Sequence, residues 1–216
     1  MTNKDAIKSG LRECGIIPVI RARSQEQALQ VVSALIEGGI RALEITFTVP
    51  GALRCIEAVA DRYGDQVLLG AGTVLDAESC RAALLAGARF IVSPALSLAT
   101  IQMTLRYAAV SVPGALTPTE VLTAWEAGAD FVKVFPCDAM GGAKYLKALK
   151  APLPQVELIP TGGVTLETAT SFLQAGAAAL GVGGDLVNQK DLDQGNWTGL
   201  AEKARRFREV VTAFRG

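Results

Sequence analysis

The sequence reads EAGADFVKVFP at residues 126–136, and three other stretches repeat its pattern: EGGIRALEITF (37–47), LAGARFIVSP (85–94) and QAGAAALGVGG (174–184). In each, the tail of a helix is followed by a small residue, a glycine and a short apolar run. A glycine just past a helix favours the left-handed conformation that ends it. A continuous short apolar run is typical of a strand buried on both faces. The pattern therefore predicts helix-to-strand transitions at Gly39, Gly87, Gly128 and Gly176.

Four further apolar runs bring the number of expected strands to eight: GIIPVIR (15–21), QVLLGAGTV (66–74), AAVSVPG (108–114) and VELIPTGG (156–163). Helices are expected between the strands, at 24–38, 50–63, 76–87, 97–107, 117–128, 142–150, 165–176 and about 198–214. Favourable N-cap residues precede several of them: Ser24, Asp76, Thr117 and Thr165. TPTE, at 117–120, is a capping box with proline at the first helical position.

Eight alternating strand–helix units predict an α/β fold of the (β/α)8, or TIM barrel, class. We expect one barrel domain over residues 1–216, with an N-terminal helix at about 3–13 covering its bottom. An open, doubly wound parallel sheet is the alternative architecture.

Composition excludes several classes of function. Lysine plus arginine and aspartate plus glutamate both number 21, so no basic excess indicates nucleic acid as a partner. No apolar run reaches the roughly 18 residues that cross a bilayer, and the N-terminus lacks an apolar signal segment. We therefore expect a cytoplasmic protein with no membrane partner, whose four cysteines are buried free thiols.

Histidine is absent from the sequence. Catalytic Ser-His-Asp and Cys-His arrangements are therefore excluded for a single chain, and the commonest metal ligand is missing. We expect no metal and no cofactor. Acid and base catalysis must fall to carboxylates, lysine, tyrosine or bound water.

Two charged residues interrupt strands that should be buried. Glu44 lies within ALEITF and Lys133 within FVKVF, near the C-terminal strand ends where barrels of this class carry their active sites. A buried structural ion pair is one interpretation. Because apolar residues replace such pairs at little loss of stability, we favour a catalytic pair. A desolvated neutral amine attacks a ketone to form an iminium, which accepts electrons as a neighbouring C–C bond breaks. Glu44 is then the candidate acid and base.

The remaining candidate residues also follow strands. Gly162-Gly163 and Gly183-Gly184 end the seventh and eighth strands, where backbone N–H groups of such barrels bind phosphate; tight turns are the plainer explanation. Arg21 and Thr73 are candidates for the carboxylate of a keto acid, although Arg21 could be an ordinary surface cation. Pro94, Phe135 and Thr161 complete the predicted substrate site.

Several segments of the chain, from about residue 14 onward, resemble the 2-keto-3-deoxy-6-phosphogluconate (KDPG) aldolase family, also called 4-hydroxy-2-oxoglutarate (KHG) aldolase. They are PVIRA, EGGIRALEITFTVPGA, GAGTVLDAE, FIVSPAL, PGALTPTE, FVKVFPCDAMGG, PTGGV and GVGGDLV. The resemblance implies a class I aldolase that cleaves a 2-keto-3-deoxy sugar acid to pyruvate and glyceraldehyde 3-phosphate, in the Entner–Doudoroff pathway of carbohydrate metabolism.

By this resemblance, Lys133 is the Schiff-base lysine, Glu44 carries protons and Thr73 contacts the pyruvate unit. Thr161 matches a position linked to stereochemical choice, where threonine favours the gluconate epimer over the galactonate epimer. The resemblance also implies a homotrimer without metal.

The chain departs from the family pattern at two positions. Phe47 replaces an arginine found in some members, and Gly184 replaces the usual serine, with Asp185 next to it. A missing hydroxyl donor should weaken phosphate binding by about 1 kcal/mol. Cleavage of 4-hydroxy-2-oxoglutarate or decarboxylation of oxaloacetate therefore remains an alternative activity. A metal-dependent isomerase or epimerase, and a non-catalytic binding protein, are the alternatives from other classes.

Overall fold

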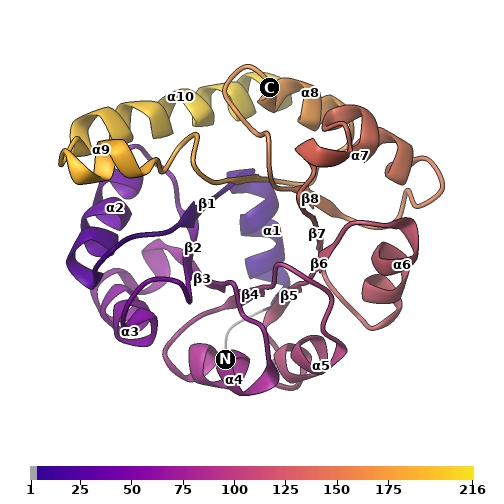
Figure 1. Ribbon diagram of the computed structural model, residues 1–216, viewed down its shortest axis with the longest axis horizontal. Coiled ribbons are helices and arrows are strands. Elements are labelled where there is room, and N and C mark those ends of the chain that lie inside the picture. Colours follow the sequence, from indigo (N-terminus) through magenta and orange to yellow (C-terminus); the bar gives the residue numbers. More distant parts are fainter. Residues whose placement is uncertain (1–3) are drawn as a thin grey trace.

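A computed structural model describes residues 4–216 as a curled parallel sheet surrounded by helices (Figure 1). The strands are β1 (Ile16–Ile20), β2 (Ala42–Thr46), β3 (Leu68–Gly72), β4 (Phe90–Val92), β5 (Val110–Val112), β6 (Gly114–Ala115), β7 (Val132–Val134), β8 (Leu158–Pro160) and β9 (Leu180–Val182). The helices are α1 (Lys4–Cys14), α2 (Gln25–Glu37), α3 (Ala52–Tyr63), α4 (Ala77–Leu85), α5 (Leu98–Arg106), α6 (Pro118–Glu126), α7 (Ala143–Lys150), α8 (Ala169–Gln174), α9 (Gln189–Asp193) and α10 (Trp197–Arg215).

The strands form two sheets in which neighbours are parallel. One has six strands in the order β5-β4-β3-β2-β1-β9, and the other has three in the order β6-β7-β8. The fifth expected strand is thus divided at Pro113, which has no N–H to donate to a ladder. Isolated bridges, Leu158 to Ala177 and Thr161 to Gly181, connect the second sheet to the region of β9. The α/β part of the predicted (β/α)8 barrel is confirmed, as a curled parallel arrangement, whereas the strands among the described residues form two sheets and not one closed ladder.

Local sequence signals account for several helix ends. Ser24, Asp76 and Thr117 cap α2, α4 and α6 through their side chains, and the capping box with Glu120 is formed. The four glycines of the repeated pattern all have positive φ, between +83° and +107°, as a left-handed helix stop requires: Gly39, Gly87, Gly128 and Gly176.

One helix prediction was wrong, one helix was not predicted, and the expected start of another lies outside the described residues. Helix α8 begins at Ala169 and not at 165, because Thr165 and Thr168 first form a turn in which the Thr168 amide donates to the Thr165 hydroxyl. The short polar helix α9 was not predicted, since it carries no apolar periodicity. Helix α1 begins at Lys4 among the described residues, and Asn3, where it was expected to start, lies outside them.

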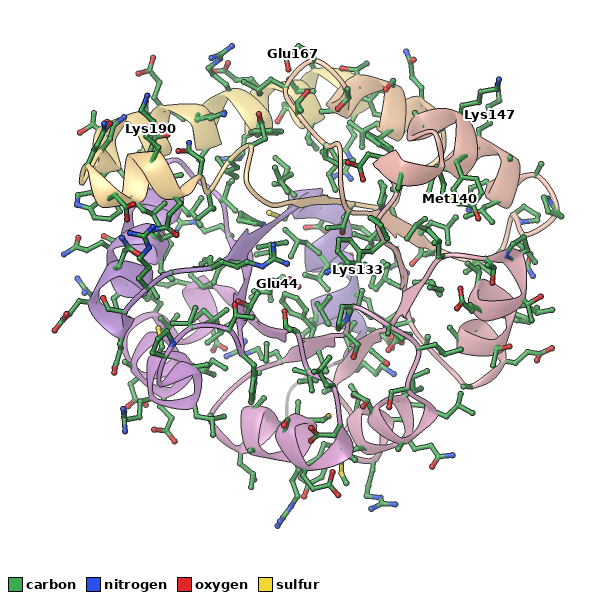
Figure 2. All side chains as sticks on the ribbon, viewed as in Figure 1. Glu44, Lys133, Met140, Lys147, Glu167 and Lys190 are labelled. Carbon is green, nitrogen blue, oxygen red and sulfur yellow. The ribbon has the colours of Figure 1, made fainter. Side chains whose placement is uncertain are left out.

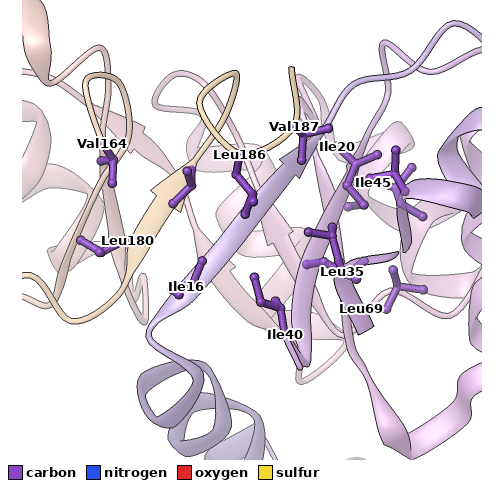
Figure 3. Packing of buried hydrophobic residues seen from close by; sticks show 14 of the residues in the cluster. Ile16, Ile20, Leu35, Ile40, Ile45, Leu69, Val164, Leu180, Leu186 and Val187 are labelled. Atoms are coloured by element: carbon purple, nitrogen blue, oxygen red, sulfur yellow. The ribbon is translucent and has the colours of Figure 1, made fainter. Parts of the chain in front are cut away.

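The core lies mainly between the strands and the outer helices, where aliphatic side chains such as Ile16, Leu35, Ile45 and Leu180 are fully buried (Figure 3). A second cluster lies near α1, inside the ring that the strands form together (Figure 1). It includes Ile7, Leu11, Phe90 and Phe131. Helix α1 crosses the opening of the ring and packs against β1, β2, β3 and β5 (Figure 1). The N-terminal ends of the strands are therefore covered, and the opposite ends are left for a site.

Candidate active site

Glu44 and Lys133 come from different sheets and meet inside the ring (Figure 2). The Lys133 Nζ lies 3.9 Å from the Glu44 Oε1, and the two side chains are only 6% and 2% exposed. Each lies within a strand whose neighbours in sequence are apolar and buried. The fold thus brings together the two residues that were singled out from the sequence.

Burial dominates the state of the Glu44 carboxyl. It raises the pKa of Glu44 above the ordinary value, while the positive charges of Lys133 and then Arg21 oppose the shift. Glu44 Oε1 is buried and has no hydrogen-bond partner among the described residues. A β-carbon at Gly72 would lie 2.7 Å from this oxygen, so the glycine makes room for the carboxyl. The arrangement suits a group that exchanges a proton with something bound beside it.

Lys133 is surrounded by apolar groups. Its Nζ lies 5.1 Å from the centroid of the Phe135 ring, and its backbone N–H donates to the carbonyl oxygen of Pro113. A small void of about 10 Å³ separates it from the opposite strands. Besides Glu44 and Lys133, that void is lined by Ile17, Val19, Val92, Val112, Ile159, Thr161 and Gly181. The amine is therefore held away from bulk water, as a nucleophilic lysine requires.

A pocket of about 300 Å³ lies next to this void, and the two share Val19 and Thr161. It contains most of the predicted substrate site: Arg21, Phe135, Thr161, Gly162, Gly163, Gly183 and Gly184. Gly162 and Gly163 have φ of +97° and +70°, so the turn after β8 requires glycine. A buried lysine at the floor and glycine-rich turns at the wall are thus parts of one continuous site.

Thr73 and Pro94 line neither cavity. Thr73 directly follows β3 with φ of +57°, a conformation that a β-branched residue rarely adopts. Such strain is frequent at functional sites. Pro94 lies so close to Gly114 that a β-carbon there would overlap its backbone. Their roles in substrate binding remain predictions.

The sequence did not show how Asp185 is oriented. The residue lines the pocket, and its buried Oδ2 lies 3.4 Å from the Nζ of Lys203 on α10. It does not cap the next helix, because Asn188 does so for α9. Sequence reasoning missed Lys203 altogether, since a lysine on an amphipathic helix carries no signal. Asp138 was missed as well, and its carboxylate packs against Gly162 and Gly163.

The described part of the chain shows neither a metal-binding cluster nor a membrane-spanning helix. No group of three or more histidine, cysteine, aspartate or glutamate side chains in residues 4–216 is arranged to hold a metal ion. No helix within that range is both long enough and apolar enough to cross a membrane.

The chain is similar to known proteins over most of its length. The model of the family described as KDPG and KHG aldolase matches residues 7–202. The 2-dehydro-3-deoxy-6-phosphogalactonate aldolase of Escherichia coli (strain K12) is 37% identical over 197 residues, which are 91% of this chain and 96% of that protein. The 2-dehydro-3-deoxy-phosphogluconate aldolase of Treponema pallidum (strain Nichols) is 34% identical over 206 residues, 95% of this chain and 97% of that protein.

Solved structures agree with the sequence comparison. A KDPG aldolase from Legionella pneumophila superimposes with a TM-score of 0.85 at 30% identity, over 94% of this chain and 97% of that one. That structure holds pyruvate captured at low pH as a covalent carbinolamine intermediate.

Proposed function

The chain belongs to the KDPG and KHG aldolase family, and we propose that it is a class I aldolase that cleaves 2-keto-3-deoxy-6-phosphogluconate to pyruvate and glyceraldehyde 3-phosphate. The observation that carries the proposal is the pair of Lys133 and Glu44, which are buried together beside a pocket. The Glu44 Oε1 has no hydrogen-bond partner among the described residues. Lys133 is the nucleophile and Glu44 the acid and base.

The first half of the reaction forms the Schiff base. Transfer of the Lys133 proton to Glu44 leaves a neutral amine, whose lone pair attacks the C2 ketone to give a carbinolamine. Glu44 then protonates the departing hydroxyl, so that water leaves and an iminium forms. The raised pKa of Glu44 suits this step, because burial favours the protonated carboxyl that donates to the departing hydroxyl.

The second half breaks the C3–C4 bond. The Glu44 carboxylate takes the proton of the C4 hydroxyl, directly or through water, and the bonding electrons move into the iminium. The products of this step are an aldehyde and an enamine on Lys133. Glu44 returns the proton to C3, and hydrolysis of the resulting iminium releases pyruvate and regenerates the amine. No oxidant, metal or further cofactor is needed for atoms and electrons to balance.

We propose that the two ends of the substrate bind at different parts of the site. Arg21 and Thr73 are proposed to bind the carboxylate of the pyruvate unit, with Pro94 and Phe135 packing beside it. The turns after β8 and β9 are proposed to bind the phosphate at the far end, through the backbone N–H groups of Gly162, Gly163, Gly183 and Gly184.

Borohydride trapping tests the proposed chemistry. The protein is incubated with pyruvate, reduced, digested and analysed by mass spectrometry for a modified lysine. We expect one pyruvate adduct on Lys133. An unmodified Lys133, or an adduct confined to an exposed lysine such as Lys147, would contradict the mechanism and return Lys133 to the role of a structural charge (Figure 2).

A second candidate function is cleavage or decarboxylation of unphosphorylated 2-oxo acids, such as 4-hydroxy-2-oxoglutarate or oxaloacetate. Gly184 and Asp185 favour it, because a hydroxyl donor is missing and a carboxylate lines the pocket. The iminium serves both reactions as the electron acceptor. A higher kcat/KM for the phosphorylated than for the unphosphorylated substrate would decide against this second candidate.

We propose the gluconate epimer as the preferred substrate, because Thr161 contributes a hydroxyl where the void and the pocket meet. The E. coli relative named for the galactonate epimer makes this choice worth measuring directly. Comparison of kcat/KM for the two phosphorylated epimers tests it.

We further propose that the two sheets act as one (β/α)8 barrel and that residues 1–216 form a single domain. Hydrogen bonds across both gaps support this: the amides of Phe131 and Lys133 donate to Ser111 and Pro113, and the Ala178 amide donates to Leu158. We expect the strands on the two sides of each gap between the sheets to exchange their amide hydrogens with solvent as one cooperative unit.

We also propose that the protein is a cytoplasmic homotrimer that needs no metal. It would act in the Entner–Doudoroff pathway. Large apolar side chains exposed between β3 and β7 support an oligomer, among them Leu75, Leu98, Leu122 and Trp125. Light scattering should give three times the 22.6 kDa mass of one chain. Activity should survive EDTA, and a strict metal requirement would favour an isomerase or epimerase instead.

A further inference from the structure

Lys203 lies on α10, outside the ring of strands, yet it reaches the wall of the substrate pocket. Its Nζ donates a hydrogen bond to the backbone carbonyl oxygen of Asp185 and lies 3.4 Å from the carboxylate Oδ2 of the same residue. Both side chains are about 30% exposed. One lysine thus binds the main chain and the side chain of the turn that follows β9.

Asp185 presents an electrostatic problem in this position. It lines the pocket beside Gly183 and Gly184, where the proposed substrate carries a phosphate. Its Oδ2 is buried and has no hydrogen-bond partner among the described residues, so Lys203 is the group that balances its charge. Without that cation, a carboxylate at the wall would repel an anionic ligand.

The loop after β8 forms another part of the pocket lining. Thr165 is one of the lining residues in that loop. The pKa of the nearby Glu167 is lowered, chiefly by a hydrogen bond with the Thr165 side chain and to a smaller extent by the charges of Arg206 and Lys203. Lys203 therefore also has a weak electrostatic effect on the loop after β8.

We propose that Lys203 is a positioning residue that determines specificity: it neutralises Asp185 and fixes the 183–187 turn, so that the pocket accepts an anionic group. This inference rests on the proposed aldolase function for the identity of the anionic ligand. It explains how a site that lacks a serine hydroxyl at Gly184 and carries a carboxylate beside it can still bind phosphate.

Steady-state kinetics of Lys203→Met test the inference. Methionine keeps much of the apolar stem and removes the charge. We expect KM for the phosphorylated substrate to rise about tenfold, which corresponds to about 1.4 kcal/mol, while kcat stays the same. KM for unphosphorylated 2-keto-3-deoxygluconate, which has no charge at the far end, should not change. Lys203→Arg should restore the low KM, since it returns the charge.

Arg205→Met is the matched control, because it removes one positive charge from the same helix at a separate surface hollow next to Gly38. It should leave KM unchanged. The double variant Lys203→Met, Asp185→Asn should recover most of the lost affinity, because the charge to be balanced is gone. Equal losses for both substrates, an equal effect of Arg205→Met, or no recovery in the double variant would each overturn the proposal.

A binding measurement separates this inference from the aldolase function. Calorimetric titration with inorganic phosphate should show weaker binding to Lys203→Met than to the unsubstituted protein, and pyruvate trapping on Lys133 should be equal in both. Failure of trapping in the unsubstituted protein would remove the aldolase assignment and leave the phosphate result to decide the role of Lys203. Equal phosphate affinity in the two proteins would refute that role.

Discussion

Two lysine–carboxylate pairs lie at opposite ends of the ring, and they are built differently. At the N-terminal strand ends, the Asp130 carboxylate lies 2.8 Å from the Nζ of Lys4 and 3.4 Å from that of Lys8, and it accepts the Ser111 amide at 2.9 Å. At the site, Lys133 and Glu44 are 3.9 Å apart, and Glu44 Oε1 has no hydrogen-bond partner among the described residues.

The difference separates a structural pair from a reactive one. Asp130 has its charge balanced twice, and its side chain remains 7% exposed, so it ties α1 to the strand that carries Lys133. Glu44 is more deeply buried and less well satisfied, which is a costly arrangement for stability alone. A pair whose purpose was stability would resemble the first. This contrast favours catalysis over the interpretation of Lys133 and Glu44 as a structural ion pair.

Replacing the nucleophile should give the largest effect. Lys133→Ala removes the proposed nucleophilic amine and should lower kcat by about 10⁶-fold, as loss of a covalent nucleophile does elsewhere. Circular dichroism should show an unchanged fold, because Glu44 can take up a proton when its cation is lost. A variant with normal turnover would contradict the Schiff-base mechanism.

Glu44→Gln should separate binding from proton transfer. Pyruvate should still be trapped on Lys133, whereas kcat should fall by about 10²- to 10⁴-fold because the acid and base is lost. Borohydride trapping and single-turnover kinetics on the same sample measure the two steps. Trapping should be slower than in the unsubstituted protein, because Glu44 also assists formation of the iminium, and normal turnover would remove Glu44 from the role of acid and base.

The same variant should change how stability depends on pH. Since burial raises the pKa of Glu44 above 4.5, the folded protein binds the proton more tightly than the unfolded chain. The resulting stabilisation is complete below that value and is lost as pH rises through the raised pKa. Urea denaturation at a series of pH values should therefore show Glu44→Gln gaining stability relative to the unsubstituted protein as pH rises. Parallel curves of stability against pH for the two proteins would show that Glu44 does not titrate in the pH range measured.

Asp130→Ala should do the opposite of the Lys133 substitution. It leaves the Ser111 amide without its acceptor, so the free energy of unfolding should fall by about 1–3 kcal/mol. The kcat/KM of the folded enzyme should be unchanged, because the site lies at the other end of the strands. A large loss of kcat/KM with full stability would show that α1 controls the site.

Thr161→Val should have the smallest effect. It exchanges a hydroxyl for a methyl group of similar size where the void meets the pocket. Preference for the gluconate over the galactonate epimer should fall by about three- to tenfold, the value of one hydrogen bond of about 1 kcal/mol. Unchanged selectivity would remove Thr161 from that role. Pyruvate trapping on Lys133 is the control that the catalytic lysine still reacts.

What could be predicted from the sequence was whatever a local pattern encodes. A charge inside an apolar strand identified Glu44 and Lys133, and glycines after helices placed the strands. The division of the sheet at Pro113 was visible in the residue type but was not inferred. Lys203 lies 18 residues from Asp185 and belongs to another element, so its role depends on packing that no local pattern records.

The glycines opposite the functional side chains have an evolutionary consequence. A β-carbon at Gly72 would strike Glu44, and one at Gly181 would overlap the hydroxyl of Thr161. Each pair should therefore change together among descendants of this chain: alanine at 72 becomes tolerable only after Glu44 has shortened, and by then the chemistry is gone. A lineage that loses catalysis should therefore show two substitutions, one of the charged residue and one of the glycine that had made room for it.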